Sequence, residues 1–184
     1  MADPSPLVGL PNVEYIELKN VSGKDINLKG CRIAANASSA PFPDYLLASD
    51  SLVILTSNNG AALLASYGTV LAIGSFPSLP NDGATLVLTS KENAVIHFVR
   101  YQPNGHENEI KEEGGWSMEM IDSDNPCAGK GNWTWSTNNY GGTPGKKNSV
   151  EGVNEDGTAP FFTSPERWPS ISRSEDAPPS MTMA

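Results

Sequence analysis

The chain of 184 residues lacks any apolar run of the length, about 20 residues, that a membrane-spanning helix needs. Basic residues are also few, because 12 Lys and Arg stand against 21 Asp and Glu and leave a net charge of −9. Binding to a phosphate backbone requires an excess of positive charge. We therefore expect no nucleic-acid partner and no membrane insertion by this chain.

Cysteine is scarce, and Cys31 and Cys127 do not have the short spacing of a zinc site. One hypothesis is a disulfide between them, which a secreted protein would permit and which typically stabilises a fold by about 2–4 kcal/mol. The alternative is two free thiols, one of them buried. Neither His97 nor His106 stands in a motif that would make a cysteine catalytic.

Long helical patterns are missing as well, and 17 Gly and 15 Pro favour frequent turns. Short alternating or continuous apolar segments recur between turn-forming residues. They predict an all-β fold, a sandwich of about seven to nine short strands. One short connector helix is expected over residues 58–68, with Asn58 or Asn59 as its N-cap.

The segment VEYIELKNVSGKDINLKGCRI, residues 13–33, contains two glutamates, Glu14 and Glu17, which raises the question of acid–base chemistry. Strand alternation places them on opposite faces, which is unsuitable for two carboxylates that share a substrate. We interpret them as the polar residues of a solvated strand face and edge. Residues 26–35 are the expected return strand, with a bulge or bend at Gly30.

Three segments, in order, resemble the lamin tail domain in its bacterial envelope and secreted branch. The first hairpin of that family is similar to EYIELKN with INLKGCRI, and its central hairpin to LPNDGATLVLTSKENAVIHFVRY. The phrase GGTPGKKNS resembles the end of the bacterial domain. The resemblance covers about residues 7–150 and implies an immunoglobulin-like sandwich, usually with one more strand before ADPSP. It also makes Cys31 unusual, because the family often has Trp there.

Two regions follow from this comparison. Residues 1–150 are expected to form one lamin-tail-like β-sandwich. Residues 151–184 are acidic and rich in proline, and they contain too few apolar residues for a core of their own. We expect them to be a linker and tail that is mostly disordered.

Candidate metal ligands are sparse. Asp122 and Asp124 lie in DSDNP, and Glu155 and Asp156 lie in NEDG. Such oxygen-rich runs suit calcium, yet neither has EF-hand spacing, and turn formation accounts for both. His106 lies in a glutamate-rich loop whose spacing is not diagnostic of a metal site. We expect no metal, no cofactor and no catalytic residue in this chain.

The resemblance implies a non-enzymatic binding or spacer module of a larger secreted or cell-surface bacterial protein, in contact with protein or a surface polymer. It implies an extracellular, periplasmic or cell-surface location, although no signal peptide is recognisable. The alternative is an accessory domain of an envelope hydrolase whose catalytic domain lies outside this chain. Two further hypotheses are a metal-dependent enzyme that uses His106 and a lamin-like DNA-binding role, which the acidic charge opposes.

Overall fold

The structure is a computed structural model that describes residues 1–102, 109–153 and 181–183. Its strands are β1 (Ile16–Asn20), β2 (Ile26–Asn27), β3 (Arg32–Ala35), β4 (Ser38–Pro41), β5 (Leu46–Leu47), β6 (Leu52–Ser57), β7 (Val70–Ile73), β8 (Ala84–Thr89), β9 (Val95–Tyr101), β10 (Met118–Met120), β11 (Trp133–Trp135) and β12 (Met181–Met183). The helical elements are α1 (Asn58–Leu64), α2 (Glu109–Glu112) and the 3₁₀ turn η1 (Lys130–Asn132). The chain is mostly β with few helices, as expected, and it has more strands and more helical turns than the sequence predicts.

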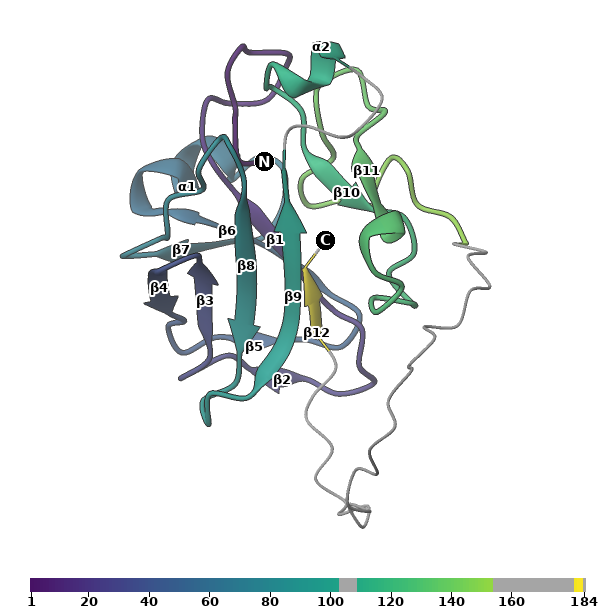
Figure 1. The fold of residues 1–184 in the computed structure, drawn as a ribbon. Coiled ribbons are helices and arrows are strands. Elements are labelled where there is room, and N and C mark those ends of the chain that lie inside the picture. Colours follow the sequence, from purple (N-terminus) through teal and green to yellow (C-terminus); the bar gives the residue numbers. More distant parts are fainter. Residues whose placement is uncertain (103–108, 154–180, 184) are drawn as a thin grey trace.

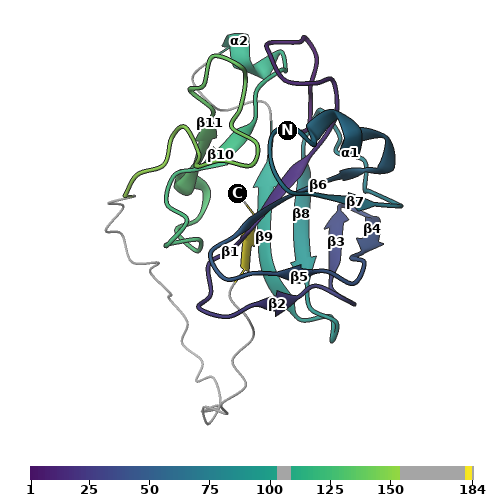
Figure 2. The same cartoon turned by 180° about the vertical axis from the view of Figure 1, so that it is seen from behind.

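Two four-stranded sheets make up the body of the molecule (Figures 1 and 2). The first sheet has the order β12-β1-β6-β7 and is antiparallel except for the parallel pair β6 and β7. The second sheet has the order β4-β3-β8-β9 and is antiparallel throughout. Figure 1 shows the small sheet β2-β5 near one end of the body and the hairpin β10-β11 near the other.

Helix α1 connects the two parallel strands β6 and β7. Parallel neighbours cannot be joined by a tight turn, so the chain requires a crossover between them. The side chain of Ser57 caps the helix by accepting a hydrogen bond from the backbone N–H of Gly60 at 3.3 Å. The short connector helix is present as predicted, but the prediction of Asn58 or Asn59 as its cap is wrong.

Strand β1 does not pair with the segment that follows it. Its neighbours are β6 and β12, whereas residues 26–35 divide between β2, which pairs with β5, and β3 in the second sheet. The predicted pairing of the first hairpin is therefore wrong. The chain changes direction at Gly30, whose φ of +83° favours glycine, so the bend expected there is present.

The second predicted hairpin is confirmed by the pairing of β8 with β9. Its register runs from Ala84 opposite Tyr101 to Thr89 opposite Val95, with an irregularity beside Leu88. Strand β9 is the last strand of its sheet, so within the described residues one of its edges has no ladder partner.

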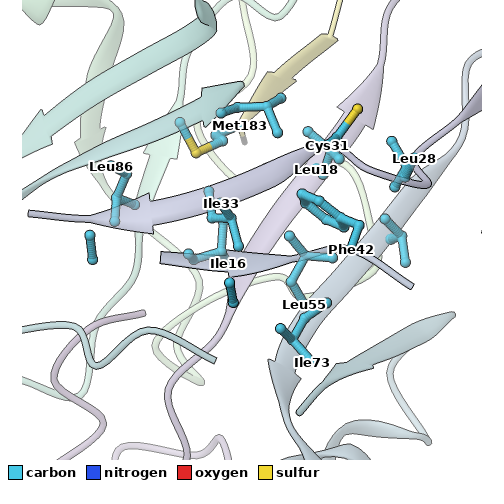
Figure 3. Packing of buried hydrophobic residues seen from close by; sticks show 14 of the residues in the cluster. Ile16, Leu18, Leu28, Cys31, Ile33, Phe42, Leu55, Ile73, Leu86 and Met183 are labelled. Atoms are coloured by element: carbon cyan, nitrogen blue, oxygen red, sulfur yellow. The ribbon is translucent and has the colours of Figure 1, made fainter. Parts of the chain in front are cut away.

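The main hydrophobic core draws side chains from both large sheets (Figure 3). The core members that Figure 3 labels are Ile16, Leu18, Leu28, Cys31, Ile33, Phe42, Leu55, Ile73, Leu86 and Met183. Cys31 is thus a buried core residue, packed among aliphatic neighbours and Phe42.

Strand β1 is covered on both of its faces. A second cluster, formed by Leu10, Tyr15, Ile54 and Leu64, lies apart from the main core. Tyr15 is buried in it, and Glu17 is only 4% exposed. The prediction that the polar face of β1 is solvated is wrong, because the N-terminal segment, α1 and the end of the domain cover that face.

The C-terminal residues form β12, which pairs antiparallel with β1 and buries Thr182 and Met183. The linker and tail expected over residues 151–184 therefore include one short strand, Met181–Met183. Strand addition at an open sheet edge accommodates this short segment. Residues 154–180 lie outside the described part of the chain, and the prediction for them stays a prediction.

Asn20, at the end of β1, joins three chain segments through a fully buried side chain. Its Nδ2 donates to the carbonyl oxygens of Lys24, Leu47 and Ala48 at 2.8–3.1 Å. Its Oδ1 accepts from the backbone N–H and the hydroxyl of Ser22. These bonds fix the loop after β1 against the loop after β5.

Replacing Asn20 with Ala should lower the free energy of unfolding by about 2–3 kcal/mol, because buried carbonyl groups lose their donors. Urea denaturation followed by circular dichroism measures this change. The matched control is Asn59→Ala at an exposed position of α1, which should change stability by less than about 0.5 kcal/mol. Equal effects of the two substitutions would contradict the role of Asn20.

Candidate functional site

The two cysteines are free in the structure, with Cys31 buried and Cys127 exposed in the loop between β10 and β11. The hypothesised disulfide is therefore not formed here. Burial raises the pKa of the Cys31 thiol. A thiol with a raised pKa stays protonated at neutral pH and is a poor nucleophile, so Cys31 has the properties of a packing residue.

The oxygen-rich run around Asp122 forms a turn. The Oδ1 atom of Asp122 accepts hydrogen bonds from the backbone N–H groups of Asp124 and Asn125, at 3.0 and 3.2 Å. The buried Asn132 closes the turn by donating to the carbonyl oxygens of Asp122 and Asn125. Among the described residues no three His, Cys, Asp or Glu side chains gather as a metal site would require.

The other metal candidates cannot be placed in the same way. Glu155, Asp156 and His106 lie outside the described ranges. The remaining histidine, His97, is buried in β9, and its Nε2 lies 3.4 Å from Oγ1 of Thr182. Burial lowers the pKa of His97, so the ring is neutral at pH 7.

Two buried glutamates hold the segment 141–149, which contains the phrase GGTPGKKNS. The carboxylate of Glu119 in β10 accepts bonds from the backbone N–H and hydroxyl groups of Thr143 and Ser149, at 2.6–3.1 Å, and from the Ser117 hydroxyl at 3.3 Å. Glu17 in β1 accepts a bond from the backbone N–H of Gly145 at 2.6 Å. Two carboxylates therefore attach this closing segment to the body.

The carboxyl group of Glu17 is held in an unusual electrostatic state. Burial raises its pKa to about 7, against the opposing effects of the Gly145 N–H and the Met1 amino group, while Glu119 raises it further. Glu14 is directed elsewhere and accepts a bond from the backbone N–H of Leu79 at 3.3 Å. Glu14 and Glu17 therefore bond to different segments, in agreement with the strand alternation, and each holds a loop in place.

A groove of about 670 Å³ lies beside β9. Its lining follows β9 without a break over residues 95–100, so it runs along the edge of the strand and not on one face only. The facing wall comes from Met118 of β10, Trp133 of β11 and the loop at Pro126 and Cys127. Figure 1 shows this arrangement, with β9 at the edge of its sheet and the β10–β11 hairpin beside it.

The β9 side of the groove is apolar and open to solvent. Val95 is 59% exposed and Phe98 is 65% exposed, and Arg100 adds a positive charge next to them. An edge strand also presents backbone N–H and C=O groups that no neighbouring strand satisfies. Apolar side chains beside such an edge form the arrangement that accepts an extended peptide as an added strand.

Strand alternation places Phe98 on the same face as Ile96, opposite His97, but it does not show that β9 ends a sheet. The groove depends on that fact, and on the hairpin of β10 and β11 folding back beside β9. The two segments that form the groove are separated in sequence by residues 103–117. No local pattern in either of them indicates that they meet.

No protein-family model matches this chain, and no curated protein matches it in a sequence search. Within the ranges that the structure covers, none of the helices has the length and apolar character needed to cross a bilayer.

The substitution Glu17→Gln should change how stability depends on pH. The folded-state pKa of Glu17 is about 7 and its ordinary value is 4.5, so the folded protein binds this proton more tightly than the unfolded chain does. Wild-type stability should therefore rise relative to the variant as pH falls from about 8 to about 5, by on the order of 2 kcal/mol.

Urea denaturation of both proteins at several pH values in this range measures the difference. The amino group of Met1, whose pKa burial lowers to about 6, opposes the trend because its contribution is lost as pH falls from 8.0 through 6. In the variant this opposing contribution is larger, because Glu17 no longer raises the Met1 pKa, and the change enlarges the difference in the same direction. A difference that is the same at every pH would contradict the altered pKa of Glu17.

Proposed function

We propose that this chain is a non-enzymatic binding module whose groove beside β9 holds an extended segment of a partner protein. The observation that carries the proposal is the unpartnered edge of β9 within the described residues, flanked by the exposed side chains of Val95 and Phe98. In this mode of recognition the backbone hydrogen bonds supply affinity, and the side chains beside the edge supply selectivity.

We also propose that the chain is an immunoglobulin-like sandwich of the lamin-tail kind and that it belongs to a larger secreted or cell-surface bacterial protein. Three observations support it. Two sheets share one core, and β8 and β9 pair at the place of the family's central hairpin. The segment GGTPGKKNS is bonded to the body through the carboxylates of Glu17 and Glu119. An all-β body that carries a surface groove suits attachment to, or spacing between, other modules.

Two other occupants of the groove belong to the same class of function. A surface polymer would contact Trp133, whose ring forms part of the wall. In the alternative role, an accessory domain of an envelope hydrolase, the groove would contact the catalytic domain of the same polypeptide. The exposed edge of β9 favours a polypeptide, since its backbone groups match those of another strand.

Phe98→Asp should weaken peptide binding without unfolding the protein, because the side chain is exposed and lies at the edge of the groove. Seven-residue peptides selected by phage display on the full chain serve as probes, and fluorescence anisotropy measures their affinity. We expect enrichment of alternating apolar sequences and at least about tenfold weaker binding to the variant.

Tyr140→Asp is the matched control, because Tyr140 is 66% exposed and does not line the groove. It should leave the affinity unchanged. Equal binding by Phe98→Asp and wild type would contradict the proposed site. A library that yields no binder, together with binding of purified peptidoglycan that Trp133→Ala removes, would identify a polymer as the ligand instead.

A further inference from the structure

The C-terminal strand β12 is attached to the outer edge of β1. In its register, Met183 lies opposite Leu18 and Thr182 lies opposite Lys19. Met183 enters the main core, as Figure 3 shows, and the hydroxyl of Thr182 lies 3.7 Å from the sulfur of Met120. Each of these contacts joins the strand to the body of the molecule.

Met1 occupies the same edge of β1. Its amino group donates to the carbonyl oxygen of Tyr15 at 3.0 Å, and its carbonyl oxygen accepts from the N–H of Tyr15 at 3.1 Å. Two bonds exchanged between the same two residues are the antiparallel pattern. Alternate strand residues direct their backbone groups to alternate edges, so Tyr15 and Lys19 share one edge. The N–H of Asn20 faces the other edge and donates to Ser51.

We call this edge of β1, from Tyr15 to Asn20, the strand lane. It carries Met1 at one end and β12 at the other, both antiparallel to β1. A cavity of about 80 Å³ is lined by Met1 and Met183 together, along with Tyr15 and Ile16. The lane therefore has the form of a slot for one strand, served here by two separate segments of the chain.

The strand lane is selective for the strand that it holds. A strand in it must place an apolar side chain opposite Leu18, where the main core receives it, and a small residue opposite Lys19, where Thr182 is fully buried. The hydroxyl of Thr182 reaches the ring of His97 at 3.4 Å, which links β12 to the second sheet. The sequence of β12 meets both conditions.

We propose that the strand lane is a strand-acceptor site and that its occupant in an assembly is the C-terminal strand of a second copy of this chain. A strand from another copy would make the same contacts with the lane as the strand of the same chain. Exchange is then governed by protein concentration relative to the effective concentration of the attached strand. Such exchange is a low-cost route from monomers to dimers.

Two complementary variants of the full chain test the exchange. Thr182→Pro disables the strand, because proline has no N–H for the ladder and its ring obstructs pairing. Lys19→Pro blocks the lane in the same way. It leaves the pairing with β6 intact, because the N–H of Lys19 faces the lane and not β6. Each variant alone should sediment as a monomer, and an equimolar mixture should form a heterodimer in which one copy donates its strand to the other.

Lys19→Ala is the control for the lane variant. The side chain of Lys19 bonds to the hydroxyl of Ser123 at 3.0 Å, and alanine removes this bond while leaving the lane open. In a mixture with Thr182→Pro, the lane of Lys19→Ala should bind its own strand. Less heterodimer should therefore form than with Lys19→Pro. A mixture of the two proline variants that stays monomeric up to about millimolar concentration overturns the proposal. So does self-association of Thr182→Pro alone.

A peptide gives a second readout that does not depend on the folding of Lys19→Pro. Fluorescein-labelled PPSMTMA, the sequence of residues 178–184, should bind full-length Thr182→Pro at least about tenfold more tightly than wild type, whose own strand competes. The same peptide with proline in place of its threonine should not bind. Equal binding to Thr182→Pro and wild type, or none to either, overturns the strand-acceptor site.

Discussion

The structure depends on the complete enclosure of β1. Main-core side chains cover one face of this strand, and the N-terminal segment, α1 and the closing segment cover the other. Its edges are occupied by β6 on one side and by Met1 and β12 on the other. Leu18 has no exposed surface as a result. A strand surrounded in this way fixes the position of each segment that touches it.

The same enclosure explains why a carboxylate lies in the interior. The closing segment 141–149 has no strand of its own, yet parts of it are buried, and buried backbone N–H groups require acceptors. Glu17 and Glu119 supply those acceptors from two different strands. Burial of an acidic group is unfavourable by itself. The raised pKa of Glu17 reflects this unfavourable burial. The carboxylate in turn holds the closing segment against β1.

The sequence predicts those parts of the fold that depend on local pattern. Alternation in Leu86 and Leu88 indicates β8, and the short helix after β6 follows from its composition. Alternation also assigns Glu17 to the face opposite Leu18, but it cannot tell whether another segment covers that face. The pairing of β1 with β12 joins residues more than a hundred positions apart, within a tail whose composition suggests disorder. The groove beside β9 likewise depends on sheet order, which no single segment encodes.

The buried asparagines have a consequence for the choice of expression host. Asn20 and Asn132 each begin an Asn-X-Ser/Thr triplet, the acceptor sequence for N-linked glycans, and neither has any exposed surface. Their amide nitrogens, to which a sugar would be joined, donate to carbonyl oxygens inside the fold. A eukaryotic secretory pathway that modifies the nascent chain before it folds would place a bulky oligosaccharide where the native packing leaves no space. Production in a cell without that modification avoids the conflict.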